Sequence, residues 1–473
     1  MTARLGKYSP DQSMRTWTPE QVARAAGARL VAPAPTTSGP ERAIIDSREA
    51  GPGALFVGLR GESVDGGRFA PQALAAGAWG VLTTPEHAEA ARCAVPGALI
   101  AVDDPLQAVQ RLATAWRREL DAKVIGVTGS TGKTSTKDLL LALLTPHRRT
   151  VASRANFNTE IGLPLEILSA PADTEVLVLE MAMRGAGQIA ELAAIAAPDV
   201  GVIVSVGPVH LELLGTLEGI AAAKAELIAA LPARATAIVP AHEPLLAPHL
   251  RPDVTTVTFG EGGDVQLRRS EDDVVEIDLA GRAIVLEVPF KQTHLRRNLL
   301  PAVAAASAVG VIPTGSVAVE LTAGRGQHVT LPGEVTLIDG CYNANPMSMR
   351  AAVEDLMQTA GRSPAARPVA VLGDMRELGP GERDYHLELG EEVARAGVEL
   401  LVTVGSLAAA IAEPFEGEVR SVPDAAAAAE LVPGLLRPGD VVLVKGSLAV
   451  GLELVCRTLR ASLPVANGAG ARA

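Results

Sequence analysis

The sequence predicts an α/β protein of three domains, in which a central P-loop mononucleotide-binding parallel sheet is followed by a C-terminal Rossmann-like doubly wound domain. Its 473 residues allow about two to four domains of roughly 100–200 residues each. Continuous apolar runs alternate with alanine-rich helical segments, which is typical of a parallel sheet covered on both faces. A glycine-rich turn joins one of these runs to a helix, and the last third repeats one order of strand, turn and helix.

The first domain is expected at residues 1–120, where short apolar strands mix with helical patterns. A helix is expected over Pro105–Arg118, because Asp104 can cap its first turn and proline is favoured at the first helical position. The expected strands are Ala43–Asp46, Ala54–Gly58, Trp79–Leu82 and Ala98–Val102.

The central domain is expected at residues 121–330, around a parallel sheet. Its expected buried strands are Lys123–Val127, Val176–Glu180, Val200–Ser205 and Ala235–Val239. Residues 254–290 differ, because short strands with alternating polarity replace the continuous apolar runs. We therefore expect a small antiparallel excursion there.

The C-terminal domain is expected at residues 331–473 and has the order of a doubly wound fold. Its expected strands are Val335–Asp339, Pro368–Leu372, Leu400–Val404 and Val441–Val444. Ligands of such folds bind beyond the carboxyl ends of the strands, so the turns after these strands are expected to form a binding edge.

The composition limits the partners of the chain. Hydrophobic residues make up 48% and charged residues 20%, which excludes disorder as the main state. The formal charge of -12 disfavours a nucleic-acid binder, which needs basic surface. The cysteines Cys93, Cys341 and Cys456 form no motif, and we see no signal peptide or membrane span. We expect a cytoplasmic monomer whose partners are small molecules.

The sharpest local feature is GVTGSTGKTS, residues 126–135, where an apolar run enters a glycine-rich turn and then a helix. Small residues let backbone N–H groups close around phosphate oxygens, and the helix N-terminus adds positive potential. Lys133 can reach terminal phosphates and Thr134 can offer its hydroxyl to Mg²⁺. The common spacing has glycine where Val127 stands. The residues expected at the phosphates are Gly129, Ser130, Thr131, Gly132, Lys133, Thr134 and Ser135.

Three more residues of the central domain are candidates for chemistry. Glu180 ends an apolar strand, and beside a P-loop such an acid typically serves Mg²⁺. His210 follows the next strand and so lies close to where ligands bind, with a hydrogen-bonded surface histidine as the alternative. Lys224 lies on an expected helix, where a plain solvated lysine is the simplest interpretation.

In the C-terminal domain, two polar turns follow strands: DGCYNANP at residues 339–346 and KGS at residues 445–447. Both stand at the edge where ligands of a doubly wound sheet bind, and ordinary loops are the alternative. Two such domains can close over a shared cleft and exclude water.

Several motifs together resemble the Mur ligases. They include GVTGSTGKTST, NFNTEIGLP at Asn156–Pro164, LEMAMRGAGQI and IDGCYNANPMSMRAA. Further similar motifs are IDSREAGPGALFVGLRGESVDG at Ile45–Gly66, VLGDMRELG at Val371–Gly379, HLELG at His386–Gly390 and VLVKGS at Val442–Ser447. The resemblance runs from about residue 44 to residue 447.

The resemblance implies ATP-driven amide ligation with ATP and Mg²⁺. In this chemistry a peptide carboxylate is phosphorylated to an acyl phosphate, an amine attacks, and a tetrahedral intermediate loses phosphate. The motifs are most similar to the branch that joins D-alanyl-D-alanine to UDP-N-acetylmuramoyl-tripeptide and makes the pentapeptide precursor of peptidoglycan. The enzyme would contribute positioning and charge neutralisation.

The resemblance also implies roles for single residues. Lys133 and Thr134 match phosphate and Mg²⁺ residues, and Glu180 and His210 match Mg²⁺ ligands. Lys224 matches a lysine that these ligases carbamylate, which turns a cation into an anionic Mg²⁺ ligand. The expected catalytic residues are Lys133, His210 and Lys224. Those implied at the nucleotide are Asn298, Arg325 and Asp339. Those implied at the other substrates are Ser47 and Arg48 at the uridine nucleotide, and Asn158, Thr159, Tyr342, Asn343, Asn345 and Lys445 elsewhere.

Four positions depart from the family pattern. Leu295 replaces an asparagine, Gly340 an acid, Gly67 a histidine and Leu448 an arginine. These departures leave two other functions open: a related ligase with another acceptor or amine, and a P-loop nucleotide-binding protein that does not ligate. The sequence also leaves open whether the third residue of the acceptor peptide is diaminopimelate or lysine.

Overall fold

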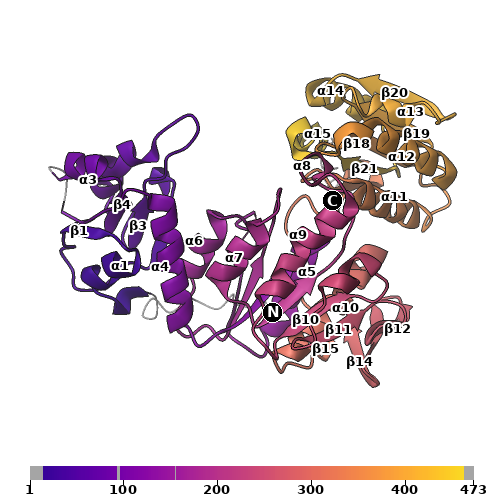
Figure 1. Ribbon diagram of the computed structural model, residues 1–473. Coiled ribbons are helices and arrows are strands. Elements are labelled where there is room, and N and C mark those ends of the chain that lie inside the picture. Colours follow the sequence, from indigo (N-terminus) through magenta and orange to yellow (C-terminus); the bar gives the residue numbers. More distant parts are fainter. Residues whose placement is uncertain (1–13, 93–95, 155, 463–473) are drawn as a thin grey trace, which may run out of the picture.

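The computed structural model describes residues 14–92, 96–154 and 156–462, and its strands form three sheets (Figure 1). The sheets follow one another along the chain as β1–β5, β6–β15 and β16–β21. The predicted α/β fold with a central and a C-terminal parallel sheet is confirmed. The domain boundaries near residues 120 and 330 stay predictions, and the first strand of the third sheet begins at Gln327.

The N-terminal sheet has the strand order β1-β5-β4-β3-β2, with β1 antiparallel to β5 and the other pairs parallel. Asp104 caps α4 as predicted, because its side chain accepts a hydrogen bond from the N–H of Gln107. The strands are β1 (Arg29–Ala32), β2 (Arg42–Ile44), β3 (Ala54–Val57), β4 (Gly80–Thr83) and β5 (Ala98–Ala101). The helices are α1 (Pro19–Ala25), α2 (Ala70–Ala75), α3 (Pro85–Ala91) and α4 (Pro105–Glu119).

The central sheet has the order β15-β14-β13-β12-β11-β10-β9-β6-β8-β7, and its pairs from β7 to β11 are parallel. Its strands are β6 (Lys123–Thr128), β7 (Thr150–Ala152), β8 (Val176–Glu180), β9 (Val200–Ile203), β10 (Thr236–Pro240), β11 (Thr255–Phe259), β12 (Val265–Glu271), β13 (Val274–Leu279), β14 (Arg282–Glu287) and β15 (Gly315–Ser316). Its helices are α5 (Lys133–Leu144), α6 (Gly162–Leu168), α7 (Gln188–Ala196), α8 (Leu211–Leu214), α9 (Leu217–Ala230) and α10 (Thr293–Ala308).

The antiparallel excursion begins later than expected. β11 pairs in parallel with β10 along its whole length, and the antiparallel pairs are β12 with β13 and β13 with β14. Alternating polarity indicates one solvated face of a strand, but it does not give the direction of the neighbouring strand. β12 was missed because its charged residues obscure the pattern, although Arg268 and Asp278 form an ion pair of 2.7 Å across β12 and β13.

The C-terminal sheet has the order β16-β17-β21-β18-β19-β20, and every pair except β16 with β17 is parallel. Its strands are β16 (Gln327–Leu331), β17 (Val335–Asp339), β18 (Pro368–Gly373), β19 (Leu400–Val404), β20 (Glu418–Val422) and β21 (Val441–Lys445). Its helices are α11 (Pro346–Ala360), α12 (Glu382–Ala396), α13 (Ala409–Ala412), α14 (Ala425–Leu435) and α15 (Glu453–Ser462). Short 3-10 helices are η1 (Met14–Thr16), η2 (Ser47–Glu49), η3 (Gly66–Phe69), η4 (Pro244–His249), η5 (Pro332–Glu334), η6 (Gly379–Gly381) and η7 (Leu448–Val450).

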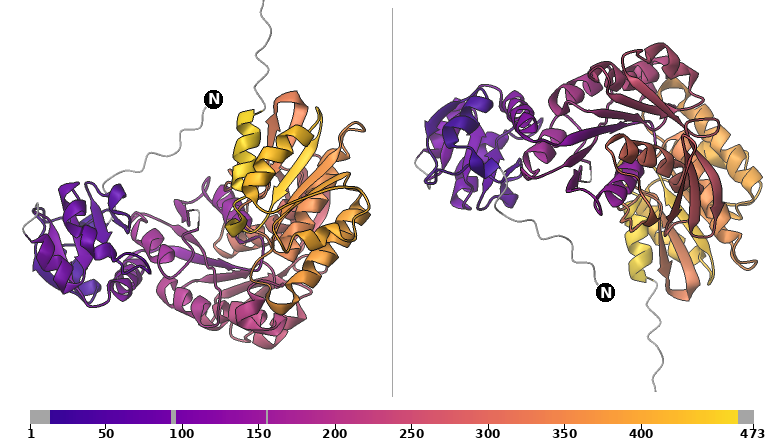
Figure 2. Two further views of the ribbon diagram at one scale, coloured as in Figure 1. Left: turned by 90° about the horizontal axis from the view of Figure 1, so that it is seen from above. Right: turned by 90° about the horizontal axis from the view of Figure 1, so that it is seen from below.

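The three domains lie in a bent row, with the N-terminal domain at one end and the C-terminal domain against the other side of the central one (Figure 2). α4 packs on α6 and α7, and α10 contacts α11. The residues at the carboxyl ends of β6 and β8 and the turns after β17 and β21 surround one cavity. None of the described helices is long and apolar enough to cross a membrane.

Candidate active site

A cavity of about 800 Å³ lies between the central and C-terminal domains. The P-loop and the end of β8 line it from one side, and the turns after β17 and β21 line it from the other. Parallel strands of both sheets end there, as expected for ligand sites of such folds. The predicted residues that line it are Gly129, Ser130, Thr131, Gly132, Lys133, Ser135, Asn158, Thr159, Glu180, His210, Lys224, Asn298, Arg325, Tyr342, Asn343, Asn345 and Lys445.

The P-loop forms the turn between β6 and α5. Gly132 precedes α5 with a φ of 79°, a left-handed backbone that favours glycine. A Cβ atom there would lie 2.7 Å from Asn298 Oδ1, so this asparagine lies against the loop. The Lys133 ammonium donates a hydrogen bond to the carbonyl of Gly129 at 2.8 Å. Burial lowers the pKa of Lys133, and the Glu180 carboxylate opposes this shift.

A segment after β9 supports the P-loop, and sequence reasoning did not assign it this role. Ser205 Oγ accepts a hydrogen bond from the N–H of Thr131 at 2.9 Å, and its carbonyl accepts one from the N–H of Ser130 at 2.9 Å. The Ser130 hydroxyl donates to the carbonyl of Gly207 at 2.9 Å. The one signal in the sequence was that Ser205 ends an expected strand at the ligand edge of the sheet.

Glu180 lies at the end of β8 between two donors. The Thr134 hydroxyl donates to Glu180 Oε2 at 2.9 Å, and the Asn158 amide donates to Glu180 Oε1 at 2.9 Å. Thr134 and Glu180 are both buried, and the hydroxyl of Thr134 is turned to this carboxylate. Hydroxyl and carboxylate oxygens are the donors that Mg²⁺ prefers, so this pair fits a magnesium ion at the phosphates.

His210 and Lys224 bring two more nitrogen atoms to the cavity. His210 Nδ1 lies 2.5 Å from Glu377 Oε2, which comes from the C-terminal domain. Burial lowers the pKa of His210, and the Glu377 carboxylate opposes this shift. Lys224 is 2% exposed, and its ammonium has no hydrogen-bond or ion-pair partner among the described residues. Burial, and then the charge of Lys133, hold its pKa well below the ordinary range, so a neutral amine is favoured.

An arginine and an aromatic ring meet on the C-terminal side of the cavity. The Arg325 guanidinium lies 3.8 Å from the ring centroid of Tyr342, in a cation–π contact. Arg325 Nε is buried and has no hydrogen-bond partner among the described residues. A buried N–H without a partner is costly, so this donor fits an acceptor on a bound ligand.

Lys445 and two asparagines shape the turns of the C-terminal domain. Lys445 Nζ donates to the carbonyl of Asn343 at 2.7 Å. Burial, and then the charge of Arg325, lower the pKa of Lys445 to about 7. Asn345 caps α11, because its Oδ1 accepts a hydrogen bond from the N–H of Ser348 at 2.9 Å. Asn345 was expected at a substrate, and in this structure its side-chain carbonyl caps a helix.

Asp339 differs from the expectation of a nucleotide contact. Its carboxylate faces α15, where Asp339 Oδ2 accepts a hydrogen bond from Arg460 Nη2 at 2.7 Å. Asp339 Oδ1 accepts one from the Cys341 thiol at 2.9 Å. Successive side chains of a strand point to opposite faces, and the last residue of β17 points away from the cavity. Asp339 is not among the residues that line the cavity, and its contact with the nucleotide stays a prediction.

The residues expected at the uridine nucleotide lie in another domain from the cavity. Ser47 and Arg48 form part of η2, and Arg48 pairs with Asp46 at 2.5 Å. The Asp46 carboxylate accepts hydrogen bonds from the guanidinium and from the backbone N–H of Arg48. These bonds lower the pKa of Asp46 to about 2. The arrangement holds Arg48 as a cation on the surface of the N-terminal domain.

The structure explains the glycine at position 67. A Cβ atom at Gly67 would lie 2.2 Å from Cδ2 of His87, so the ring of His87 fills the space of the missing side chain. His87 Nε2 lies 3.1 Å from Asp65 Oδ2. An imidazole therefore reaches this point from α3 and not from position 67.

Glu377 is a further functional candidate that sequence reasoning missed. It lies in the turn after β18 with a φ of 65°, and it contacts His210 across 167 residues of sequence. Arg184 Nε lies 4.0 Å from Glu377 Oε1. The motif VLGDMRELG marked this turn, but nothing in the sequence indicated its partner.

The cavity is more basic than the protein as a whole. Six lysines and arginines line it against four aspartates and glutamates, whereas the chain carries a formal charge of -12. The basic residues are Lys133, Arg184, Lys224, Arg325, Arg376 and Lys445, and the acidic ones are Glu160, Glu180, Asp355 and Glu377. A basic cavity beside a glycine-rich helix entry suits a polyphosphate with its metal ion. Fold and site together define a three-domain P-loop protein with a nucleotide site at a domain junction.

Three family models match this chain in order. They are the Mur ligase family catalytic domain at residues 43–117, the Mur ligase middle domain at residues 127–306 and the Mur ligase glutamate ligase domain at residues 324–448. The chain belongs to the Mur ligase family.

Two curated relatives carry the name UDP-N-acetylmuramoyl-tripeptide–D-alanyl-D-alanine ligase. The Synechocystis protein is 38% identical over 429 residues, which cover 89% of this chain and 92% of the relative. The Bacillus subtilis protein is 35% identical over 428 residues, which cover 88% and 92%.

Solved structures agree with this relationship. MurF from Acinetobacter baumannii has a TM-score of 0.82 at 28% identity and covers 94% of this chain and 99% of its own. MurF ligase from Thermotoga maritima in complex with ADP has a TM-score of 0.75 at 30% identity and covers 89% and 98%.

Proposed function

We propose that this chain joins D-alanyl-D-alanine to UDP-N-acetylmuramoyl-tripeptide, with conversion of ATP to ADP and phosphate. One observation carries the proposal: a single basic cavity holds the P-loop, Glu180, His210 and Lys224 opposite the polar turns of the C-terminal domain. The names of the relatives support the choice of substrates. The product is the pentapeptide nucleotide used in peptidoglycan synthesis.

The central domain would bind ATP with Mg²⁺. The P-loop N–H groups and Lys133 would hold the phosphates, and Asn298 and Arg325 would contact the rest of the nucleotide. Mg²⁺ would be held by Thr134, Glu180 and His210, and when bound it neutralises charge on the phosphates. The ammonium of Lys133 already lies over the loop, where it donates to the carbonyl of Gly129.

The chemistry overcomes the low reactivity of a carboxylate. Its negative charge repels nucleophiles and its oxide is a poor leaving group, and phosphorylation removes both obstacles. The terminal carboxylate of the tripeptide would attack the γ-phosphorus of ATP, and ADP would leave. The amine of D-alanyl-D-alanine would then attack the acyl carbon, lose a proton and expel phosphate. The cations of the cavity would stabilise both charged transition states.

Each substrate would be held by a different domain. Ser47 and Arg48 would bind the uridine nucleotide, and Asn158 and Thr159 would hold the peptide near the phosphates. The turns that carry Tyr342, Asn343, Asn345 and Lys445 would receive D-alanyl-D-alanine. The tripeptide would then reach from the N-terminal domain to the cavity.

Lys224 is proposed to act as a carbamate. Burial and Lys133 favour its neutral amine, and a neutral amine adds to carbon dioxide with loss of a proton. The new anion would ligate a second Mg²⁺ beside His210. Depletion of carbon dioxide and bicarbonate should slow the wild type, and their return should restore the rate. An unchanged rate with full activity of Lys224→Ala would contradict this role.

A coupled assay tests the proposal. Purified chain with ATP, Mg²⁺, UDP-N-acetylmuramoyl-tripeptide and D-alanyl-D-alanine should release phosphate and form the pentapeptide nucleotide. Mixtures that lack either peptide substrate should not form it. Nucleotide binding without any product would instead indicate a P-loop protein that does not ligate. Acceptors with diaminopimelate and with lysine should be compared side by side.

A related ligase with another amine is the second candidate. Leu448 stands where the family usually has arginine, lines the cavity and is 59% exposed. An apolar side chain at the C-terminal wall favours a less charged partner than an arginine would. A panel of dipeptides and amino acids separates the two candidates. A cytoplasmic monomer stays our prediction for the state of the protein.

A further inference from the structure

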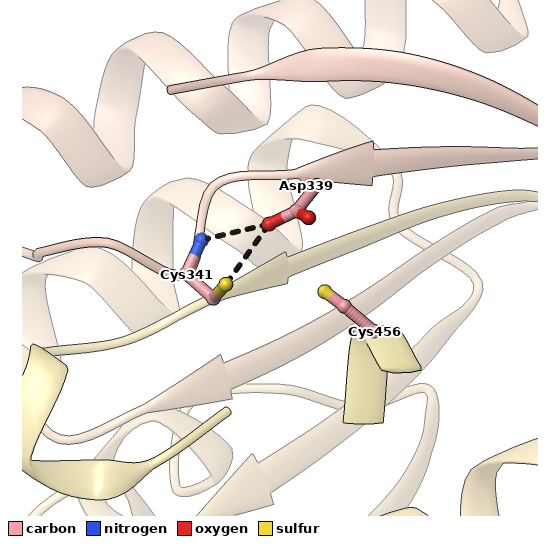
Figure 3. Close-up of side chains that lie close together, drawn as sticks. All are labelled: Asp339, Cys341 and Cys456. Carbon is pink, nitrogen blue, oxygen red and sulfur yellow. Dashed lines mark hydrogen bonds between the residues drawn. The ribbon is translucent and has the colours of Figure 1, made fainter. Parts of the chain in front are cut away.

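Three side chains that can ligate a metal lie together behind the turn that follows β17 (Figure 3). Asp339 ends β17, Cys341 follows in the turn, and Cys456 comes from α15. They are 4%, 6% and 1% exposed. One ligand atom from each residue lies within 4.8 Å of the others. Two segments far apart in the sequence thus bring a carboxylate and two thiols to one buried point.

Hydrogen bonds connect the group and tie it to α15. The Cys341 thiol donates to Asp339 Oδ1 at 2.9 Å, and Arg460 Nη2 donates to Asp339 Oδ2 at 2.7 Å. The hydrogen bond with Cys341, burial and the Asp339 carboxylate raise the pKa of the Cys456 thiol. Figure 3 shows the sulfur of Cys456 turned toward the other two residues.

We propose that Asp339, Cys341 and Cys456 form a binding site for a thiophilic divalent cation of the zinc type. Zinc accepts thiolate and carboxylate ligands, and thiolates of a tetrahedral site with Zn–S bonds of about 2.3 Å lie about 3.7 Å apart. Ligand atoms already within 4.8 Å need only small movements to reach that geometry. A water molecule or a backbone carbonyl would complete the shell.

Binding would replace two S–H bonds with two metal–thiolate bonds and release two protons, without electron transfer. The Asp339 carboxylate, which raises the pKa of the Cys456 thiol, also attracts a cation and therefore favours a bound metal ion. The guanidinium of Arg460 is 40% exposed and can turn to solvent when the cation arrives. A disulfide between these cysteines would instead need an oxidant and a thiolate that burial and Asp339 oppose.

The site is separate from the proposed magnesium site, and it does not depend on the proposed function. Its donors are soft sulfur atoms, whereas Thr134 and Glu180 offer hard oxygens. Its ligand Cys341 directly precedes Tyr342 and Asn343, which line the cavity. A metal ion there would fix this turn against α15.

Cadmium serves as the spectroscopic probe for this site. The full chain with Cys93→Ser, reduced and stripped of metal, should develop the ultraviolet thiolate-to-cadmium band up to one ion per chain. Zinc should compete with cadmium, and Mg²⁺ should not. The same chain should release two protons per ion and should protect two thiols from a thiol reagent.

Matched variants locate the ligands. Cys341→Ser and Cys456→Ser, each with Cys93→Ser, should weaken cadmium binding by more than about tenfold, a cost seen even for groups outside the ligand shell. Asp339→Asn should weaken it while the thiolate band remains. Unchanged thermal unfolding of the metal-free variants would show that they are folded. No band in the Cys93→Ser chain at one ion per chain, or an undiminished band in Cys456→Ser, overturns the proposal.

Discussion

The two domain junctions of this chain are built differently. The N-terminal and central domains share one apolar core that runs from η1 through α4 to α9. Trp116 of α4 lies within it at 2% exposure, and its indole N–H donates to the carbonyl of Ala170 at 3.1 Å. This junction is packed like the interior of a single domain.

The junction between the central and C-terminal domains is polar. The apolar clusters of the C-terminal domain contain no residue from the central domain among those described. Across this junction, His210 contacts Glu377 at 2.5 Å, and the Gln358 amide donates to Thr293 Oγ1 at 2.7 Å. The cavity occupies the space between these contacts.

The difference shows where movement and chemistry can be combined. Separating an apolar core exposes large area to water, whereas polar contacts can be exchanged for water or ligand at low cost. We therefore expect the first two domains to move as one unit and the C-terminal domain to close on it when substrates bind. The candidate site lies at the junction that can move.

The largest effect should come from opening the apolar junction. Trp116→Ala removes a buried ring that packs edge-on against Trp17 at 5.5 Å, and should cost about 3–5 kcal/mol of unfolding free energy. Gln358→Ala at the polar junction is the matched comparison and should cost about 1 kcal/mol or less. Urea unfolding measures both. Equal losses of unfolding free energy in the two variants would contradict the distinction between an apolar and a polar junction.

Lys133→Ala should lower activity and not stability, because this residue lies in the candidate site and outside the apolar core. Loss of one charged donor at a phosphoryl group should lower kcat by about 10²–10³, with unfolding free energy unchanged or raised. Lys123→Ala is the control, since Lys123 begins β6, the strand that leads into the P-loop, is 63% exposed and pairs with Asp199. Steady-state kinetics should give the kcat of both variants. A control variant as slow as Lys133→Ala would contradict the assignment.

Glu377→Gln tests a contact that crosses the polar junction. The carboxylate raises the pKa of His210 against the effect of burial, so its removal should lower that pKa further. If neutral His210 is the active form, the acid limb of the kcat/KM profile should move to lower pH. Glu212→Gln, an exposed acid nearby, should leave the profile in place. A shift to higher pH in Glu377→Gln would refute the coupling.

The smallest effect concerns Lys445, whose pKa of about 7 lies below its ordinary value of 10.5. Between these values the unfolded chain binds more protons at this residue than the folded chain does, so its contribution to unfolding free energy rises with pH. The unfolding free energy of the wild type minus that of Lys445→Met should therefore increase from neutral to alkaline pH. If the unfolding free energies of both proteins changed with pH in parallel, burial would not shift the pKa of this lysine.

The sequence predicted the elements that local patterns specify. The P-loop, the buried strands of the parallel sheets and the cap of α4 by Asp104 follow from neighbouring residues. The strands β1, β7, β12, β15, β16 and β20 were missed, because their segments are short or polar and give no apolar run. The direction of β11 was also missed, because pairing depends on residues elsewhere in the chain.

Side-chain orientation is the feature of the site that sequence patterns do not specify. Glu180, His210 and Lys224 were expected together and do line one cavity, whereas Asp339 turns to Arg460 although it ends a strand at the same edge. Position at a sheet edge follows from the sequence, but the face that a strand-end side chain takes depends on packing. The Glu377 contact needed the arrangement of two domains.

Transfer of an isotope tests the central claim most directly. The tripeptide nucleotide would carry heavy oxygen in the carboxylate that is to be joined, and the released phosphate would be examined by mass spectrometry. If the cavity activates this carboxylate as an acyl phosphate, each phosphate should carry one heavy oxygen from the peptide. Phosphate without the label, released while the pentapeptide forms, would contradict the account.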